Sequence, residues 1–124
     1  MAIIIDHIAL PAHDHEGSAR FFAQIMGLSY AGPDRHFAPV RVSPTFTVTF
    51  LHAENFSAAH LAFVIGEDEF ATIHGNIQAA GIAYGNSPRD PQNGRTDHPF
   101  GGLGLFFTDL NGHLFEVMTQ NRDT

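Results

Sequence analysis

The stretch HIALPAHDHEGSARFFAQIMGLSY (residues 7–30) has a counterpart later in the chain, HLAFVIGEDEFATIHGNIQAAGIAY (residues 60–84). Each begins with histidine, an aliphatic residue and alanine, and continues as a short apolar run. Each then shows a helical pattern that ends at a glycine and is followed by an aliphatic residue, a small residue and tyrosine. His7 and His60 therefore hold equivalent places, and the pairing predicts an internal repeat.

The segments around these two stretches alternate apolar and polar residues in the manner of strands. We expect helices at residues 16–26 and 68–80, each stopped by glycine. We expect strands near residues 3–10, 37–42, 45–52, 58–65, 82–84, 104–108 and 113–119. The order predicts an α+β fold in one domain, 1–124, made of two β-α-β-β-β modules, residues 1–55 and 56–124.

Composition excludes several classes of function. Hydrophobic residues make up 44% of the chain, and no apolar run reaches the roughly 18–20 residues of a membrane span, which favours a globular protein. The first residues lack the basic flank of an export signal, so we expect a cytoplasmic protein. Cysteine and lysine are absent, which removes disulfides, thiolate ligands and lysine Schiff bases. A net charge of −7 and only six scattered arginines argue against a nucleic-acid partner.

A carboxylate interrupts the apolar stretch NGHLFEVMT (residues 111–119) at Glu116. An unpaired buried carboxylate costs several kcal/mol, so Glu116 needs a partner or the surface. If helices cover the more apolar face of each strand, then His7, His60 and Glu116 all point to the uncovered side, while His113 points away. Two imidazoles and a carboxylate suit one divalent metal ion, with iron, manganese, nickel and zinc all chemically suitable.

Three short motifs carry a family resemblance: DHIAL (6–10), AHLAFVI (59–65) and DLNGHLFEV (109–117). They resemble the glyoxalase/bleomycin-resistance/extradiol-dioxygenase superfamily, also called the vicinal oxygen chelate proteins, and the resemblance covers nearly the whole chain. It implies paired modules that form a curved, partly open barrel around a metal or ligand cup. It also implies His7, His60 and Glu116 as metal ligands and a homodimer, with the metal held by one chain or shared by two.

The superfamily draws a fourth metal-site position from the last strand of the first module. Thr49 matches this position best, and His52 and Glu54 are the alternatives. Proteins that resemble glyoxalase I usually carry a glutamate or glutamine there, so a threonine weakens the prediction of a glyoxalase-like lyase.

The stretch TDHPFGGLGLFFTDLNGHLFE (96–116) is similar to the closing signature of extradiol dioxygenases. The resemblance places His98 beside the substrate, as a catalytic acid/base or an orienting group. Phe106 stands where that family has a tyrosine, and Leu110 where it has a proline. The first change removes a hydroxyl that could donate a hydrogen bond. We expect the substrate pocket to be lined by Thr49, Phe50, Phe100, Phe106 and Met118.

The resemblance therefore implies a metal-dependent enzyme most like an extradiol ring-cleaving dioxygenase, acting on a small molecule that chelates the metal through adjacent oxygens. The alternatives are an antibiotic-binding protein of the bleomycin-resistance type, with or without metal, a fosfomycin-type thiol transferase and a glyoxalase-like lyase. The transferase needs cations for a phosphonate, and only Arg89 or Arg95 could supply them.

Overall fold

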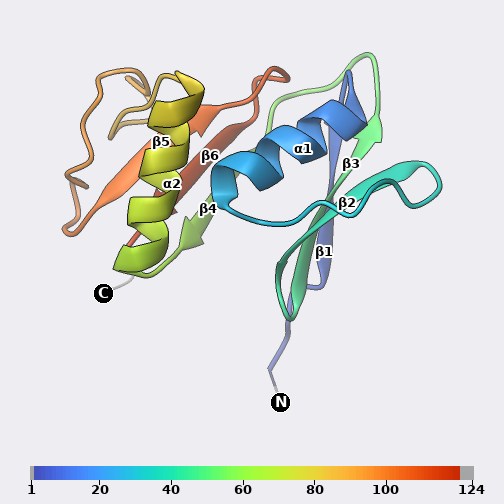
Figure 1. Ribbon diagram of the computed structural model, residues 1–124, viewed down its shortest axis with the longest axis horizontal. Coiled ribbons are helices and arrows are strands. Elements are labelled where there is room, and N and C mark those ends of the chain that lie inside the picture. Colours follow the sequence, from blue (N-terminus) through green and yellow to red (C-terminus); the bar gives the residue numbers. More distant parts are fainter. Residues whose placement is uncertain (1, 121–124) are drawn as a thin grey trace. The chain divides into compact units, whose positions relative to one another are not determined.

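The computed structural model describes residues 2–120 and divides into two compact units, Met1–Ser57 and Ala58–Thr124 (Figure 1). The first unit contains β1 (His7–Ala12), α1 (His15–Met26), β2 (Phe37–Ser43) and β3 (Phe46–His52). The second contains β4 (His60–Val64), α2 (Glu67–Ala80), β5 (Gly104–Thr108) and β6 (Leu114–Met118). No helix within residues 2–120 is long and apolar enough to cross a membrane.

The two units share one topology. The strand order is β1-β3-β2 in the first sheet and β4-β6-β5 in the second. In each sheet, the last strand lies in the centre. It pairs in parallel with the strand before the helix, and it forms an antiparallel hairpin with the third strand. The predicted α+β repeat is confirmed, although each unit is β-α-β-β and has one strand fewer than expected.

Two segments expected in strands lack a pairing partner: the first part of the strand expected at residues 3–10, and the whole of residues 82–84. Ile3, Ile4 and Ile5 are exposed and lie outside β1, because the pairing of β1 with β3 begins only at His7 and Thr47. Residues 82–84 form no strand, and only the next residue, Gly85, bridges to Phe106. A β-branched or aromatic pattern predicts a strand only where a neighbouring backbone is available to pair with it.

The predicted helix boundaries are confirmed to within one residue, because local capping chemistry sets them. The Asp14 side chain accepts a hydrogen bond from the Gly17 amide at 3.0 Å and caps α1. Gly27 and Gly81 end the two helices in the left-handed conformation, with φ of 71° and 69°.

Each helix covers one face of its sheet and leaves the other face open. In the first unit, Phe22 of α1 packs edge-to-face on Phe50 of β3, with ring centroids 6.0 Å apart. In the second, Phe115 and Val117 are fully buried, as are Ile77 of α2 and most of its apolar side. Strand side chains alternate, so the residues between these core positions belong to the open face of each sheet.

Candidate functional site

Two of the predicted metal ligands lie on the open face of the second sheet. His60 begins β4 and Glu116 is the central residue of β6. The register pairs Ala62 with Glu116, and Ala62 follows His60 by two residues, so both side chains point to the same side. Glu116 is 0% exposed, whereas the His60 side chain is 44% exposed.

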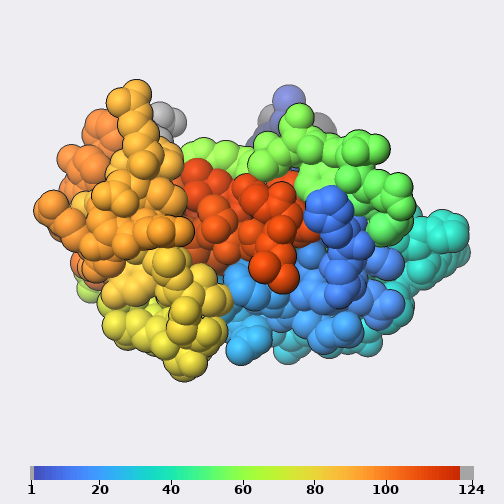
Figure 2. Space-filling model, turned by 90° about the horizontal axis from the view of Figure 1, so that it is seen from above, coloured from blue at the N-terminus to red at the C-terminus, as the bar shows by residue number. Residues whose placement is uncertain are grey.

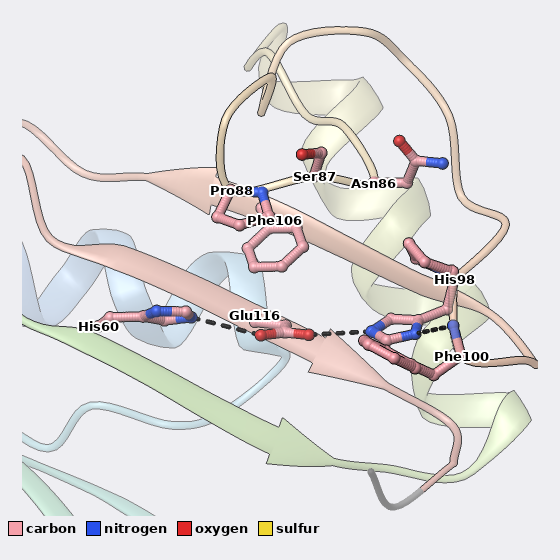
Figure 3. Close-up of a pocket in the computed structure, with 9 residues that line it drawn as sticks. His60, Asn86, Ser87, Pro88, His98, Phe100, Phe106 and Glu116 are labelled. Carbon is pink, nitrogen blue, oxygen red and sulfur yellow. Dashed lines mark hydrogen bonds and ion pairs between the residues drawn. The ribbon is translucent and has the colours of Figure 1, made fainter.

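Glu116 lies in a row between two imidazoles (Figure 3). Its Oε1 is 3.3 Å from Nε2 of His60, and its Oε2 is 3.1 Å from Nε2 of His98. An ionised carboxylate only accepts hydrogen bonds, so both imidazoles donate to it. These two contacts give the buried carboxylate its partners, so Glu116 is not an unpaired charge within an apolar strand.

His98 reaches Glu116 from the loop before β5. It is buried, and its Nδ1 accepts a hydrogen bond from the Phe100 amide at 3.1 Å. A neutral His98 therefore carries its proton on Nε2, the nitrogen that faces Glu116. Gly104 leaves room for the ring, because a Cβ at position 104 would overlap it.

A cavity of about 100 Å³ lies over this row of side chains. Phe100 and Phe106 form apolar walls, and residues 86–88 form a roof (Figure 3). The Phe106 ring centroid is 5.9 Å from that of His60. Phe100 and Phe106 thus line the cavity with Glu116, as expected. The residues that sequence reasoning missed here are Asn86, Ser87, Pro88 and Pro99, which sit in a loop without periodic pattern.

The roof is held by polar contacts within the loop of residues 85–99, which stands out as an orange ridge in Figure 2. The Asn86 side-chain amide donates to the Asp97 carbonyl at 2.9 Å, and Asn93 donates to Asn86 at 2.7 Å. Arg95 donates to both carboxylate oxygens of Asp97, at 3.1 and 2.8 Å. The hydrogen bond from Arg95 lowers the pKa of Asp97 from its ordinary value and raises that of Arg95.

The third predicted ligand, His7, lies in the first unit. Its side chain is 62% exposed, and its Nδ1–H donates to the carboxylate of Asp6 at 2.8 Å. The bond leaves Nε2 as the free nitrogen. His7 lines a cavity of about 430 Å³ together with Asp34, Thr47 and Thr49. Asp6 was not predicted, although its place next to His7 was a usable signal.

Strand register identifies the counterpart of Glu116 in the first unit. His7 and His60 are repeat equivalents, and two residues later Ala9 pairs with Thr49 just as Ala62 pairs with Glu116. Thr49 therefore occupies the position equivalent to Glu116. His52 lies three residues further along β3 and donates from Nδ1 to the His13 carbonyl at 3.0 Å. Glu54 lies beyond the end of β3.

Two residues expected in the substrate pocket lie elsewhere. Phe50 packs on α1, because it alternates with Thr49 and so faces the covered side of the sheet. Met118 is buried near the end of β6, opposite Gly104, and does not line the cavity that holds Glu116. His113 is fully buried, and its Nδ1 accepts the Ala59 amide at 2.9 Å, so it serves the fold, in line with its expected orientation away from Glu116.

Within residues 2–120, no three histidine or acidic side chains converge on one point that could hold a metal ion. In the row of His60, Glu116 and His98 the two imidazole nitrogens face the carboxylate rather than a common centre. The spacing of one pair does suit a shared ion. Two ligand atoms that each lie about 2.1 Å from a metal are about 3.0–3.4 Å apart in octahedral or tetrahedral geometry, and His60 Nε2 and Glu116 Oε1 are 3.3 Å apart.

Solved structures similar to the chain include two proteins described as oxidases. Oxidase ChaP-H2 is 35% identical with a TM-score of 0.90, over 98% of this chain and 96% of that one. Oxidase ChaP-H1 is 30% identical with a TM-score of 0.91, over 99% and 100%. A glyoxylase/bleomycin resistance protein/dioxygenase domain from Frankia sp. EAN1pec shares the fold at 18% identity, with a TM-score of 0.71 over 98% and 100%.

No protein-family model and no curated protein matches the chain. The structural matches nevertheless extend over almost the full length of both oxidases at 30% identity or more, and the repeated unit accounts for the architecture. The chain belongs to the glyoxalase/bleomycin-resistance/dioxygenase superfamily, the vicinal oxygen chelate proteins.

Proposed function

We propose that this protein is a divalent-metal-dependent enzyme that oxidises a small molecule chelating the metal through adjacent oxygens, in the manner of an extradiol ring-cleaving dioxygenase. The observation that carries the proposal is the fully buried carboxylate of Glu116, with Nε2 of His60 at 3.3 Å. The similarity to two proteins described as oxidases supports oxidation over isomerisation or thiol transfer.

The proposed ligands are His7, His60 and Glu116. Histidines that bind metals usually donate their second ring N–H to a carboxylate or carbonyl, which fixes the tautomer and raises the basicity of the ligand. His7 has such a bond, because Asp6 accepts from its Nδ1 at 2.8 Å and leaves Nε2 for the metal. A bound divalent ion would act as a Lewis acid, lowering the pKa of the chelating substrate hydroxyls.

His98 is proposed to hold the ligand carboxylate in place. It donates to Oε2 of Glu116 at 3.1 Å, which leaves Oε1, beside His60, as the oxygen that would bind the metal. Both nitrogens of the His98 ring are engaged, one by Glu116 and the other by the Phe100 amide. The arrangement favours an orienting role for His98 over a role as general base.

The metal proposal is tested by measuring the metal content of the purified protein and its affinity for Fe²⁺, Mn²⁺, Ni²⁺ and Zn²⁺. We expect one ion per chain, lost in His60→Ala and Glu116→Gln and retained in Arg41→Gln, a control at an exposed residue of β2. If the protein takes up no divalent ion and His7→Ala leaves ligand binding unchanged, the enzyme proposal fails and a metal-free binding protein replaces it.

The ring-cleavage proposal is tested separately, with catechol as the probe substrate and oxygen uptake as the readout. Phe106 lines the cavity without a hydroxyl, so Phe106→Tyr places a hydrogen-bond donor there. We expect Phe106→Tyr to raise kcat for formation of the ring-opened product. Oxygen uptake without a ring-opened product, in both proteins, would contradict ring cleavage while leaving a metal-dependent oxidase in place.

We also propose a homodimer, which light scattering of the purified protein tests. Mixing His7→Ala with Glu116→Gln under exchange conditions then locates the ligands. Recovery of metal binding shows that one site takes residues from two chains, and no recovery shows that each chain builds its own site.

A further inference from the structure

A second cavity of the first unit has a different chemical character from the one beside His7. It measures about 460 Å³ and is lined by His15, Arg35, His36, Leu51 and His52. Four of these five residues are basic or can become so, and none is acidic. Such a cluster of basic side chains is unusual in a chain with net charge −7 and six basic residues apart from histidine. The two cavities share no lining residue.

The basic side chains gather where several elements end. β1 and β3 are parallel and finish side by side at Ala12 and His52, and α1 begins at His15. The positive end of the helix dipole therefore lies at this edge of the sheet. His52 is held by its hydrogen bond to the His13 carbonyl, and its ring lies edge-to-face with that of His15 at 6.5 Å.

Arg35 occupies a strained backbone position at the cavity. Asp34 and Phe37 exchange two backbone hydrogen bonds, of 2.8 and 3.0 Å, around the two-residue turn Arg35–His36. Arg35 has φ of 59° and, among residues 2–120, is the only non-glycine residue with positive φ. Glycine adopts this conformation without steric cost, whereas a residue with a Cβ atom adopts it only at a steric cost. Strain of this kind tends to persist where the side chain has a function.

The carboxylates closest in sequence to these basic residues do not line this cavity. Asp14 caps α1 through the Gly17 amide, and Glu16 lies 3.9 Å from Arg20 on the same helix. Asp34 lines the cavity of His7 instead. The guanidinium of Arg35 therefore has no acidic neighbour among the lining residues of its cavity.

We propose that this cavity binds the oxyanion group, phosphate or carboxylate, of a small anionic ligand, with Arg35 as the principal contact and His15, His36 and His52 around it. A guanidinium is permanently charged and binds both oxygens of such a group through parallel hydrogen bonds. The same permanent charge opposes a metal cation in this cavity, although imidazoles alone would suit one. The proposal is independent of the metal site proposed for His7, His60 and Glu116.

The experiment is a titration of the full chain with inorganic phosphate and, in a second arm, with acetate, followed by the histidine ring signals in NMR. We expect saturable shifts at His15, His36 and His52, and none at the buried His113. The arm with the lower dissociation constant identifies the oxyanion class. The absence of saturable shifts in both arms overturns the proposal, as does binding of Zn²⁺ to these histidines without binding of either anion.

Three variants test the role of Arg35. Arg35→Gln should weaken binding by about tenfold or more, whereas Arg41→Gln, at an exposed arginine of the same unit, should stay within about twofold. Arg35→Gly should lose binding and yet melt at a higher temperature, because it removes the strain at φ 59°. A purely structural arginine would not combine these two effects. Unchanged anion affinity in Arg35→Gln contradicts the proposal.

Discussion

The open faces of the two sheets show how a repeated scaffold can carry different chemistry. The first strand of each sheet begins with a histidine, His7 or His60. Both sheets have the same strand order, and their parallel strand pairs have the same register. At the equivalent central position, one has Thr49, whose buried hydroxyl has no hydrogen-bond partner, and the other has Glu116, with both oxygens bonded. The repeat has the same geometry in both units, while the side chain at this position decides which unit supplies a charged group.

The loops that follow the helices differ as well. Residues 28–36 connect α1 directly to β2 and end in the tight turn of Arg35 and His36. Residues 82–103, between α2 and β5, are much longer and supply both His98 and the roof of the cavity. The second unit therefore supports its carboxylate with an added segment that the first unit lacks.

The largest expected effect comes from changing the two equivalent positions. Glu116→Gln keeps the shape of the side chain but removes the charge. It should lower metal affinity by more than roughly 100-fold, which is the upper end of the loss caused by removing a residue that hydrogen-bonds to a metal ligand. Thr49→Val should leave metal affinity within about twofold, and raise the free energy of unfolding by up to about 1 kcal/mol, because the hydroxyl it removes has no partner. Calorimetric metal titration and thermal unfolding measure both. Equal losses in the two variants would contradict the distinction between these positions.

The next effect concerns the support of Glu116. His98→Gln should lower metal affinity by about 10–100-fold, because the carboxylate loses the donor that orients it. KM for the substrate should change less than kcat. A variant with normal metal affinity and a shifted pH profile of kcat would instead make His98 a general acid or base.

A smaller effect should follow from crowding the His98 ring with a side chain at position 104. Gly104→Ala places a methyl group against the ring and should cost about 1–3 kcal/mol of unfolding free energy, together with some metal affinity. Gly75→Ala is the matched control, because nothing lies within 4 Å of its added Cβ in α2. It should stabilise the protein by about 0.5–1 kcal/mol and leave metal binding unchanged. Chemical denaturation of both variants measures the difference, and equal stability would show that Gly104 does not position His98.

The smallest expected effect is that of low pH on the loop of residues 85–99. The Arg95 hydrogen bond holds the pKa of Asp97 below its ordinary value of 3.8, so its contribution to stability is present at neutral pH. That contribution should be lost only as pH falls through the lowered value, and the effect should be small, because both side chains are exposed. An NMR titration of the loop amides should show this transition below 3.8 and lose it in Asp97→Asn. A transition above 3.8 would contradict the role of Arg95.

Much of the fold could be predicted because it follows from local chemistry. The helices ended where Gly27 and Gly81 predicted, and strand alternation placed His60 and Glu116 on one face. The same alternation, applied to Phe50, already set it opposite to Thr49 and on the covered face. The strand prediction was wrong for Ile3–Ile5 and for residues 82–84, because strand formation also requires a partner backbone.

The sequence by itself determined the repeat, the helix ends and the open faces that carry His7, His60 and Glu116. Only the tertiary structure decided that Thr49, rather than His52 or Glu54, is the counterpart of Glu116, and that His98 bonds to that carboxylate. The reason is physical. Periodicity and capping depend on neighbours within a turn or two, whereas register and loop contacts depend on hydrogen bonds between residues far apart in the chain.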